Sequence, residues 1–355
     1  MKHLRYFVSF VGLAAVLLLV LSWLDIQRIR SQLKQERISL SQKKADLHWA
    51  QVDQNKNRVE VLSGYFQTIQ LFIDQGLKEP SAPPSLIKEA EEITLETLPQ
   101  LDGRGKGELL LFLYSESLIG KCPLHSAKMY CQIPGRIPIL SLVGADLRRA
   151  KLREISLNGA DLRRTDLRGV DFRDSDLTKV DFRKANLSGA NLSTAVLYGA
   201  DLSGAFLRVA ILKQTRLGCY ASCSGTPAAS LRQTDLQGAD LTGANLGYVS
   251  LEGGNLREAL LINAKLAGAK LEEASFVDAD LAGAHLSYYW KGSCSDSSWE
   301  ARVATVNNTD FTNANLSRAN LQGLMIDISL GIEGAELSNA NLDAAQIGSG
   351  PEGNC

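Results

Sequence analysis

The sequence predicts a mainly β solenoid, a square coil of stacked turns, preceded by an α-helical region and an N-terminal transmembrane helix. Three observations lead to this prediction. A five-residue pattern runs from Leu142 almost to the C-terminus, nineteen uncharged residues fill 6–24, and apolar residues recur at helical spacing between them. A repeat of fixed period decides the architecture before local propensity does.

The segment 6–24 is dominated by Leu, Val, Phe and Ala. As an α-helix it would be about 29 Å long, close to the ~30 Å hydrocarbon core of a bilayer. Lys2 and Arg5 precede it, and a small-residue cleavage site is barely present. We therefore expect a retained single-pass anchor over residues 1–24 rather than a cleaved signal peptide.

Two signals disagree about the side of the membrane on which the repeats would lie. Basic residues after the apolar segment outnumber those before it, which favours the cytoplasm. Six cysteines, an even number, favour disulfides in an oxidising compartment, with Cys122 to Cys131 and Cys219 to Cys223 as candidate pairs. We expect a cytoplasmic repeat domain, with a periplasmic or lumenal domain or free loop thiols as the alternatives.

A helical region follows the apolar segment. Apolar residues recur every seven positions at Ile26, Leu33, Leu40 and Leu47. The positions between them include Glu36 and Lys43, so we expect a helical stalk over 25–78, or a loosely self-associating helix, rather than a strong coiled coil. Residues 79–139 are expected to hold a linker, a helical capping region and a Cys-containing insert.

The repeating unit is a small residue, Asp or Asn, Leu or Phe, and then two polar residues. Successive leucines would lie about 140° apart on an α-helix and on opposite faces of a strand. A chain that turns once per repeat instead directs every Leu inward, and four turns make a coil of about 20 residues stacked at ~4.8 Å. We expect interior columns that include Leu147, Leu162, Leu167, Phe172, Leu177, Phe182, Leu187, Leu192, Leu202, Leu241, Leu246, Leu281, Leu316 and Leu321.

The repeat domain is expected over 140–348, with a tail at 349–355 and insertions at 218–230 and 287–303. Insertions in solenoids form loops that often bind partners. The second insertion and its border contain four aromatic residues, Tyr288, Tyr289, Trp290 and Trp299, in a chain with only 6% aromatics. They indicate either a partner-binding loop or a loop that packs locally over a gap in the stack.

The repeated Ala-(Asp/Asn)-Leu pattern over 142–347 resembles the pentapeptide-repeat family, whose members form right-handed quadrilateral β-helices. The sequence LDGRGKGELLLFLYSESLI, followed by PILSLVGADL, is similar to the membrane-anchored pentapeptide-repeat proteins of cyanobacteria. In those proteins a helical segment precedes the first repeat. An apolar helix over 109–118 would cap the first coil, whose backbone edge would otherwise be unpaired.

The sequence contains no recognisable catalytic arrangement. Its four histidines are isolated, the recurring Asp residues are outward repeat positions, and GRGKGE at 103–108 lacks the spacing of a phosphate loop, so we interpret it as a turn before a helix. Cys122, His125 and Cys131 do not have a standard zinc spacing. We predict a protein without enzyme activity, cofactor or metal, which acts as a membrane-anchored scaffold for an unknown protein partner and could form homo-oligomers.

Charge separates this interpretation from an alternative. Residues 140–217 hold fourteen Lys/Arg and nine Asp/Glu, whereas residues 218–355 hold seven and sixteen. The resemblance also allows a DNA-mimicking inhibitor of a type II topoisomerase, but only the distal half is acidic, and we expect no nucleic-acid partner. Acidic lipid or protein could bind the basic residues Arg148, Arg149, Lys151, Arg153, Arg163, Arg164 and Arg168.

Overall fold

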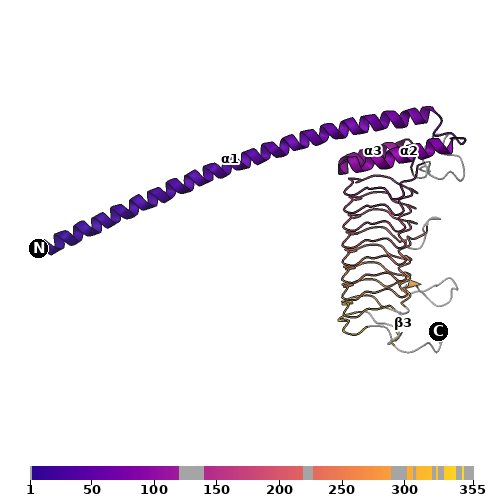
Figure 1. Cartoon of the computed structure of the whole chain (residues 1–355). Coiled ribbons are helices and arrows are strands. Elements are labelled where there is room, and N and C mark those ends of the chain that lie inside the picture. Colours follow the sequence, from indigo (N-terminus) through magenta and orange to yellow (C-terminus); the bar gives the residue numbers. More distant parts are fainter. Residues whose placement is uncertain are drawn as a thin grey trace. The chain divides into compact units, whose positions relative to one another are not determined.

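The computed structural model of the 355-residue chain describes residues 2–119, 140–218, 227–288, 302–306, 309–321, 325–326, 332–340 and 346–347. The chain divides into two compact units, Met1–Glu60 and Val61–Cys355. The first unit is the N-terminal part of helix α1 (Lys2–Asp74). The second unit begins within the same helix and contains all the remaining helices and strands of the described residues (Figure 1).

The structure does not support the predicted single-pass anchor over 1–24. Among the described residues, no helix combines the length and the apolar character needed to cross a membrane. Residues 6–24 lie in the first part of α1, an uninterrupted helix of 73 residues whose later sequence is polar. The membrane localisation and the transmembrane part of the predicted fold are therefore wrong.

Three helical segments accompany the end of α1 in the second unit. They are α2 (Pro84–Thr97), the 3₁₀ helix η1 (Leu98–Gln100) and α3 (Gly103–Ser115). Tyr65 of α1 is buried and its hydroxyl lies 2.7 Å from the Thr94 hydroxyl of α2. Phe66 and Phe112 join α1 to α3 with ring centroids 4.4 Å apart. Burial of apolar surface between these helices is what holds them together.

Helix α3 covers the first coil of the repeat domain (Figure 1). The Asp102 carboxylate accepts a hydrogen bond from the Gly105 amide at 2.7 Å and caps the helix N-terminus. The Gly103 carbonyl accepts from the Lys151 amide at 2.7 Å, so the helix backbone takes the place of a preceding coil. The predicted turn at 103–108 is therefore the first part of α3, and the helix begins six residues earlier than the predicted start at residue 109.

Each repeat is one corner of a square coil. In most repeats, the amide three positions after the central Leu or Phe donates to the carbonyl of that central residue, as from Ala145 to Leu142 at 3.0 Å. The residue directly before the donating amide has a positive φ, as at Gly144 and Arg149, and this conformation identifies a type II turn. A regular alternation of one turn and one extended residue pair generates the coil.

Successive coils are joined by parallel bridges that form four faces, called A, B, C and D in chain order. Face A contains Asp146, Asp166, Asn186, Phe206, Asp235, Asn255, Ser275 and Asp310. Face B contains Lys151, Asp171, Asn191, Ile211, Asp240, Leu260, Asp280, Asn315 and Glu336. Face C includes Asp176, Val196 and Arg216, and face D includes Asp161, Asp181 and Asp201.

Continuous strands are few because each face is only one bridged residue wide. Among the described residues, β1 (Ser287–Tyr288) pairs antiparallel with β2 (Arg302–Val303), and β3 (Met325–Ile326) pairs parallel with β4 (Gln346–Ile347). The predicted β-helical coil is confirmed, but its ladders consist mainly of isolated bridges.

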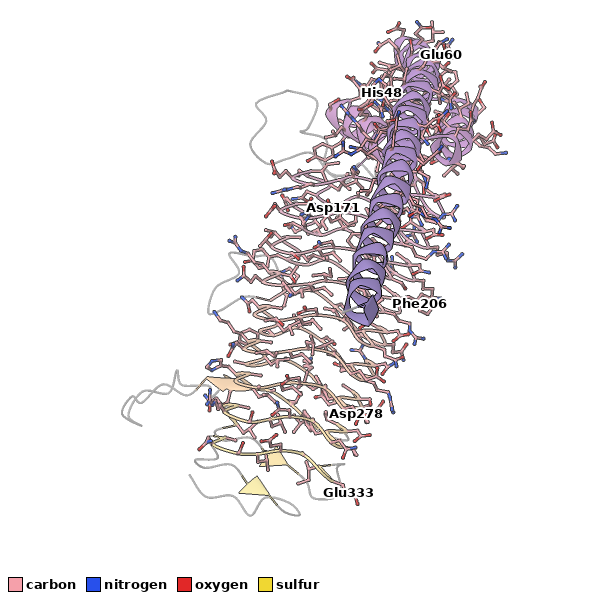
Figure 2. All side chains as sticks on the ribbon, turned by 90° about the vertical axis from the view of Figure 1, so that its left-hand side faces the viewer. His48, Glu60, Asp171, Phe206, Asp278 and Glu333 are labelled. Carbon is pink, nitrogen blue, oxygen red and sulfur yellow. The ribbon has the colours of Figure 1, made fainter. Side chains whose placement is uncertain are left out.

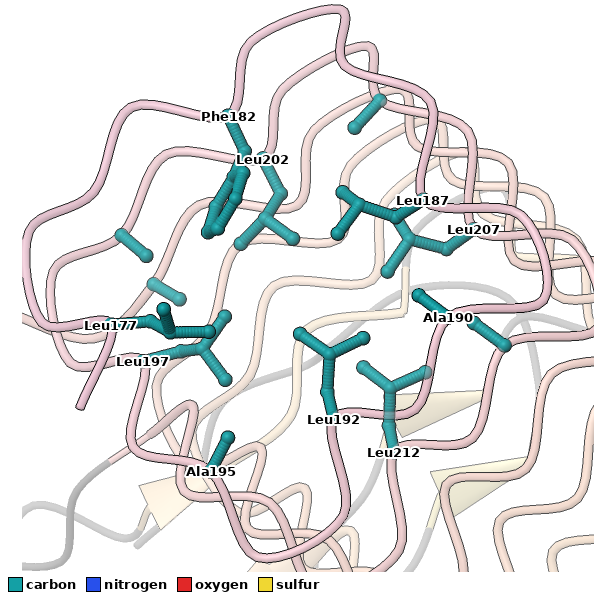
Figure 3. Close-up of a cluster of buried hydrophobic side chains, with 14 of the residues drawn as sticks. Leu177, Phe182, Leu187, Ala190, Leu192, Ala195, Leu197, Leu202, Leu207 and Leu212 are labelled. Carbon is teal, nitrogen blue, oxygen red and sulfur yellow. The ribbon is translucent and has the colours of Figure 1, made fainter. Parts of the chain in front are cut away.

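The core of the coil is a set of stacked side chains from all four faces (Figure 3). Every residue named above for the interior columns is buried, with at most 2% of its surface exposed. Phe172 and Phe182 meet edge to face at 6.1 Å, and Phe276 stacks on Phe311 at 5.2 Å. Each fully buried Leu or Phe contributes about 1.5–3 kcal/mol, so the column as a whole stabilises the coil.

Both long insertions leave the coil at the same corner. The chain departs after Leu217 on face C and resumes at Ser230 on face D, which is bridged to Asp201. It departs again after Leu286 on face C and resumes at Thr305 on face D. The columns of faces A and B therefore continue without an inserted segment from coil 1 to coil 8.

Candidate interaction surface

The candidate functional surface lies diagonally opposite the corner that carries the insertions. It comprises face A, face B and the turn residues between them, where each face includes the residue two positions after the bridged one, such as Arg148 on face A and Arg153 on face B. We call it the A/B side. In most coils, the amide of the turn residue between faces A and B donates to the carbonyl of the residue just before the equivalent turn residue in the next coil, as from Arg149 to Arg168. These turn residues form a column along the coil stack: Arg149, Gly169, Gly189, Val209, Gly238, Glu258, Asp278, Asn313 and Gly334. Asp171, Phe206, Asp278 and Glu333, all on this side, are labelled in succession along the coil in Figure 2.

A local motif fixes five of the ten arginines in the first four coils. The Arg168 guanidinium donates to the Asp166 carboxylate through Nε at 2.8 Å and through Nη2 at 2.6 Å, and the Arg168 amide adds a third bond at 3.3 Å. These bonds follow from the Asp-x-Arg spacing, which places both groups on the same outer face of one turn. Similar pairs join Asp146 to Arg148, Asp161 to Arg163, Asp171 to Arg173 and Asp181 to Arg183.

These pairs perturb the carboxyl groups. The hydrogen bonds from the Arg168 side chain hold the pKa of Asp166 below its ordinary value, and Arg173 does the same for Asp171. Arg148 holds the pKa of Asp146 well below its usual range, with a further contribution from the buried Lys106 at 3.1 Å. These three carboxylates are therefore ionised near neutral pH.

Charge on the A/B side is divided between the two halves of the coil stack. In the first four coils, it carries eight basic and three acidic residues: Arg148, Arg149, Lys151, Arg153, Arg168, Arg173, Arg208 and Lys213, against Asp146, Asp166 and Asp171. In the described part of the later coils it carries one basic and eight acidic residues: Arg257, against Asp235, Asp240, Glu258, Asp278, Asp280, Asp310, Glu333 and Glu336.

The remaining surface of the described coils is close to neutral. In the first four coils, it has six basic residues, namely Arg163, Arg164, Lys179, Arg183, Lys184 and Arg216, and six acidic ones, namely Glu154, Asp161, Asp174, Asp176, Asp181 and Asp201. In the later coils it has Arg232, Lys265, Lys270 and Arg318, against Glu252, Glu272 and Glu273. The charge asymmetry seen in the sequence therefore lies on the A/B side.

The same side exposes apolar residues near its middle. Phe206 is 49% exposed, Val209 65%, Ile211 36% and Leu260 39%, and we call these four residues the apolar patch. Phe206, Ile211 and Leu260 occupy bridge positions that elsewhere on these faces are mostly Asp, Asn or Ser. The residues predicted from the sequence do not include these three, although the interruption of the Asp/Asn pattern at their positions could have revealed them.

Val209 has an unfavourable backbone conformation. Its φ is +50°, and it is the one aliphatic residue with a positive φ among the described residues. A β-branched residue in this region is a conformational outlier, and such strain costs on the order of 1–2 kcal/mol relative to glycine. The equivalent turn positions in neighbouring coils are Gly189 and Gly238. An exposed, strained Val contributes little to the fold itself, which suggests a role on the surface.

The other residues selected from the sequence are placed as follows. Arg148, Arg149, Lys151, Arg153 and Arg168 lie on the A/B side, whereas Arg163 and Arg164 lie on and beside face D. Tyr288 lies in β1, and its side chain, together with Tyr289, Trp290 and Trp299, falls outside the described residues. So do all six cysteines, including both candidate disulfide pairs. Within the described ranges no group of three or more His, Cys, Asp or Glu could hold a metal ion.

Comparison with known proteins identifies the class to which this coil belongs. The family model "Pentapeptide repeats (8 copies)" matches residues 141–178, 175–214, 228–261, 259–288 and 304–326. The chain belongs to the pentapeptide-repeat family, whose proteins fold as right-handed β-helices. Nothing in the comparisons confirms the resemblance to the membrane-anchored cyanobacterial proteins. A search of curated proteins found no match.

Several solved structures are similar to the chain. HetL, a pentapeptide-repeat protein involved in heterocyst differentiation regulation in the cyanobacterium Nostoc, is 25% identical, with 67% of this chain and 92% of that one covered and a TM-score of 0.33. QnrB1, a plasmid-mediated fluoroquinolone resistance protein, is 23% identical over 56% and 90%, with a TM-score of 0.28. The Nostoc pentapeptide-repeat protein alr5209 is 33% identical over 28% and 69%, with a TM-score of 0.16. These low TM-scores leave the family assignment to the repeats themselves.

Proposed function

We propose that this protein is a non-enzymatic scaffold whose coil stack binds a protein partner through the A/B side. One observation carries the proposal: this side combines the charge asymmetry of the molecule with the exposed patch of Phe206, Val209, Ile211 and Leu260. Apolar residues surrounded by charged ones are typical of protein interaction sites. The remaining coil surface is near neutral, and the insertions enter at the opposite corner.

The DNA-mimic alternative is less well supported by the charge distribution. The five later coils extend about 24 Å at ~4.8 Å per coil, a length over which duplex DNA carries roughly 14 phosphate charges. The A/B side of those coils has eight acidic residues and one basic residue, and the first four coils are basic. A supercoiling assay with a type II topoisomerase checks this conclusion, because inhibition by micromolar protein would favour the mimic.

Proximity labelling in the native cell tests the scaffold proposal. A labelling enzyme is fused to the full chain, and the recovered proteins are compared between wild type, Phe206→Asp and a matched control, Val196→Asp. Asp is already present at positions 166 and 235 of face A and at 176 of face C, so both substitutions fit the fold. We expect a reproducible partner that Phe206→Asp loses and Val196→Asp retains. Equal recovery with both variants would refute the role of the A/B side.

A further inference from the structure

We propose that a second copy of this chain binds the A/B side, with the two coil stacks side by side and antiparallel. This inference rests on the proposed function, since it identifies the partner of the same surface. Three observations support it: the position of the apolar patch along the stack, the different charges on either side of that patch, and the lack of an insertion at the A/B corner of the described coils.

The apolar patch lies on both sides of one coil, and on face B its members Ile211 and Leu260 occupy equivalent positions. Phe206, Val209 and Ile211 belong to coil 4 (202–217), and Leu260 belongs to coil 6 (251–266). Between them lies coil 5 (231–246), where Asp240 is bridged to Ile211 on one side and to Leu260 on the other. We place a two-fold axis in the interface, at the level of coil 5 and perpendicular to the stack. This axis brings coil 4 of each copy against coil 6 of the other. Such an isologous contact uses the same patch twice.

The same operation matches the charges. It places coil 1, where the A/B side carries four basic residues and one acidic residue, against coil 9 of the second copy, where that side carries Glu333 and Glu336. The A/B sides of coils 2 and 3, which have no net charge, lie against the acidic coils 8 and 7. A parallel pair would oppose basic to basic and acidic to acidic surfaces, which like-charge repulsion disfavours. Charge complementarity between the basic first coil and the acidic last coil therefore favours the antiparallel orientation.

The carboxylates closest to the axis are already compensated within each copy. Lys213 Nζ lies 2.9 Å from the Asp240 carboxylate, and Arg208 Nε lies 3.9 Å from that of Asp235. The two Asp240 groups can consequently approach each other without opposing two uncompensated charges. Over the described coils from 1 to 8, the chain passes the A/B corner without an insertion.

Sedimentation velocity of the full chain tests the inference. We expect a dimer at about 50 mM salt that weakens at about 500 mM, because a Debye length of only a few ångströms screens the opposed charges. Ile211→Asp and Leu260→Asp should each raise the dimer dissociation constant tenfold or more, whereas the face C control Val196→Asp should leave it unchanged. A monomer at all concentrations, or a dimer that survives both substitutions, would overturn the inference.

Orientation is tested by photo-crosslinking from a benzoylphenylalanine at position 313, at the A/B corner of coil 8. We expect adducts on coil 2 (162–177) of the second copy. Adducts on coil 8 or on α1 would show an end-to-end or a helix-mediated dimer and would overturn the antiparallel arrangement. If the chain is monomeric but still loses a different partner on Phe206→Asp, this inference fails while the proposed function stands.

Discussion

The contact between α3 and the first coil gives the sharpest stability prediction, for Gly107→Ala. A Cβ at Gly107 would overlap the Lys151 carbonyl oxygen, and one at Gly103 would overlap the Arg149 carbonyl oxygen. These are backbone atoms, so no side chain can rotate away. The two glycines, one helical turn apart, allow the helix backbone to approach the coil edge directly.

Two opposing effects determine the size of the change. Ala is more favourable than Gly inside a helix by roughly 1 kcal/mol. Against this, α3 must retreat by on the order of 1 Å, which removes about a quarter to a half of the dispersion contacts across the interface. Leu109, Leu110 and Leu113 of α3 are fully buried, and each contributes about 1.5–3 kcal/mol. Weakening of the buried Lys106–Asp146 ion pair adds to the loss. We expect a net destabilisation of about 2–4 kcal/mol.

Urea unfolding followed by circular dichroism measures this change, and Gly64→Ala is the matched control. Gly64 is also helical, but a Cβ there would meet nothing within 4 Å, so the same substitution should stabilise by about 0.5–1 kcal/mol. Hydrogen exchange of the Lys151 amide, which donates to Gly103, should accelerate only in Gly107→Ala. If Gly107→Ala stabilises the protein as much as Gly64→Ala does, the close-approach argument is refuted.

Three further predictions concern the outer surface and the cap. Val209→Gly should stabilise the protein by about 1 kcal/mol in urea unfolding, because it removes the positive-φ strain, and an unchanged midpoint would contradict this. Arg168→Ala should raise the pKa of Asp166 toward its ordinary value in an NMR titration. Because a lowered carboxyl pKa stabilises the fold above about pH 4 and this stability is lost as pH falls, the stability of the variant should decline less steeply than that of wild type below pH 4. Asp102→Ala should cost about 1 kcal/mol by removing the α3 N-cap, and loss of Gly105 amide protection in hydrogen exchange checks the mechanism.

The coil could be predicted from the sequence because its signal is a simple period. A five-residue repeat with an interior Leu is incompatible with both helix and strand, so only a turning chain remains. The turns have a positive φ at one fixed position, which the sequence fills with Gly, Asn and Asp but also with Lys, Glu and Arg. At those charged positions, the period was a better guide than turn propensity.

The start of α3 could not be predicted for a different reason. Three glycines within Gly103–Gly107 lower helix propensity, and the segment is predicted as a turn before a helix. Contact with the first coil overrides that propensity, because only residues without a Cβ allow the Lys151 amide to reach the helix carbonyl. Lys106, which resembled part of a phosphate loop, is instead buried and paired with Asp146.

The A/B side could not be found from the sequence because its recognition requires the column of each residue to be known across the insertions. The spacing of 14 between Leu217 and Leu231 equals one ordinary step of five plus nine extra residues, all taken up at the corner between faces C and D. Ile211, Asp240 and Leu260 therefore share one column, although 29 residues separate the first two. Without that register, the net charges of the two halves look like a property of the whole surface. With it, they separate into a near-neutral remainder and one side with a net basic first half, an apolar centre and a net acidic second half. An antiparallel copy complements this arrangement.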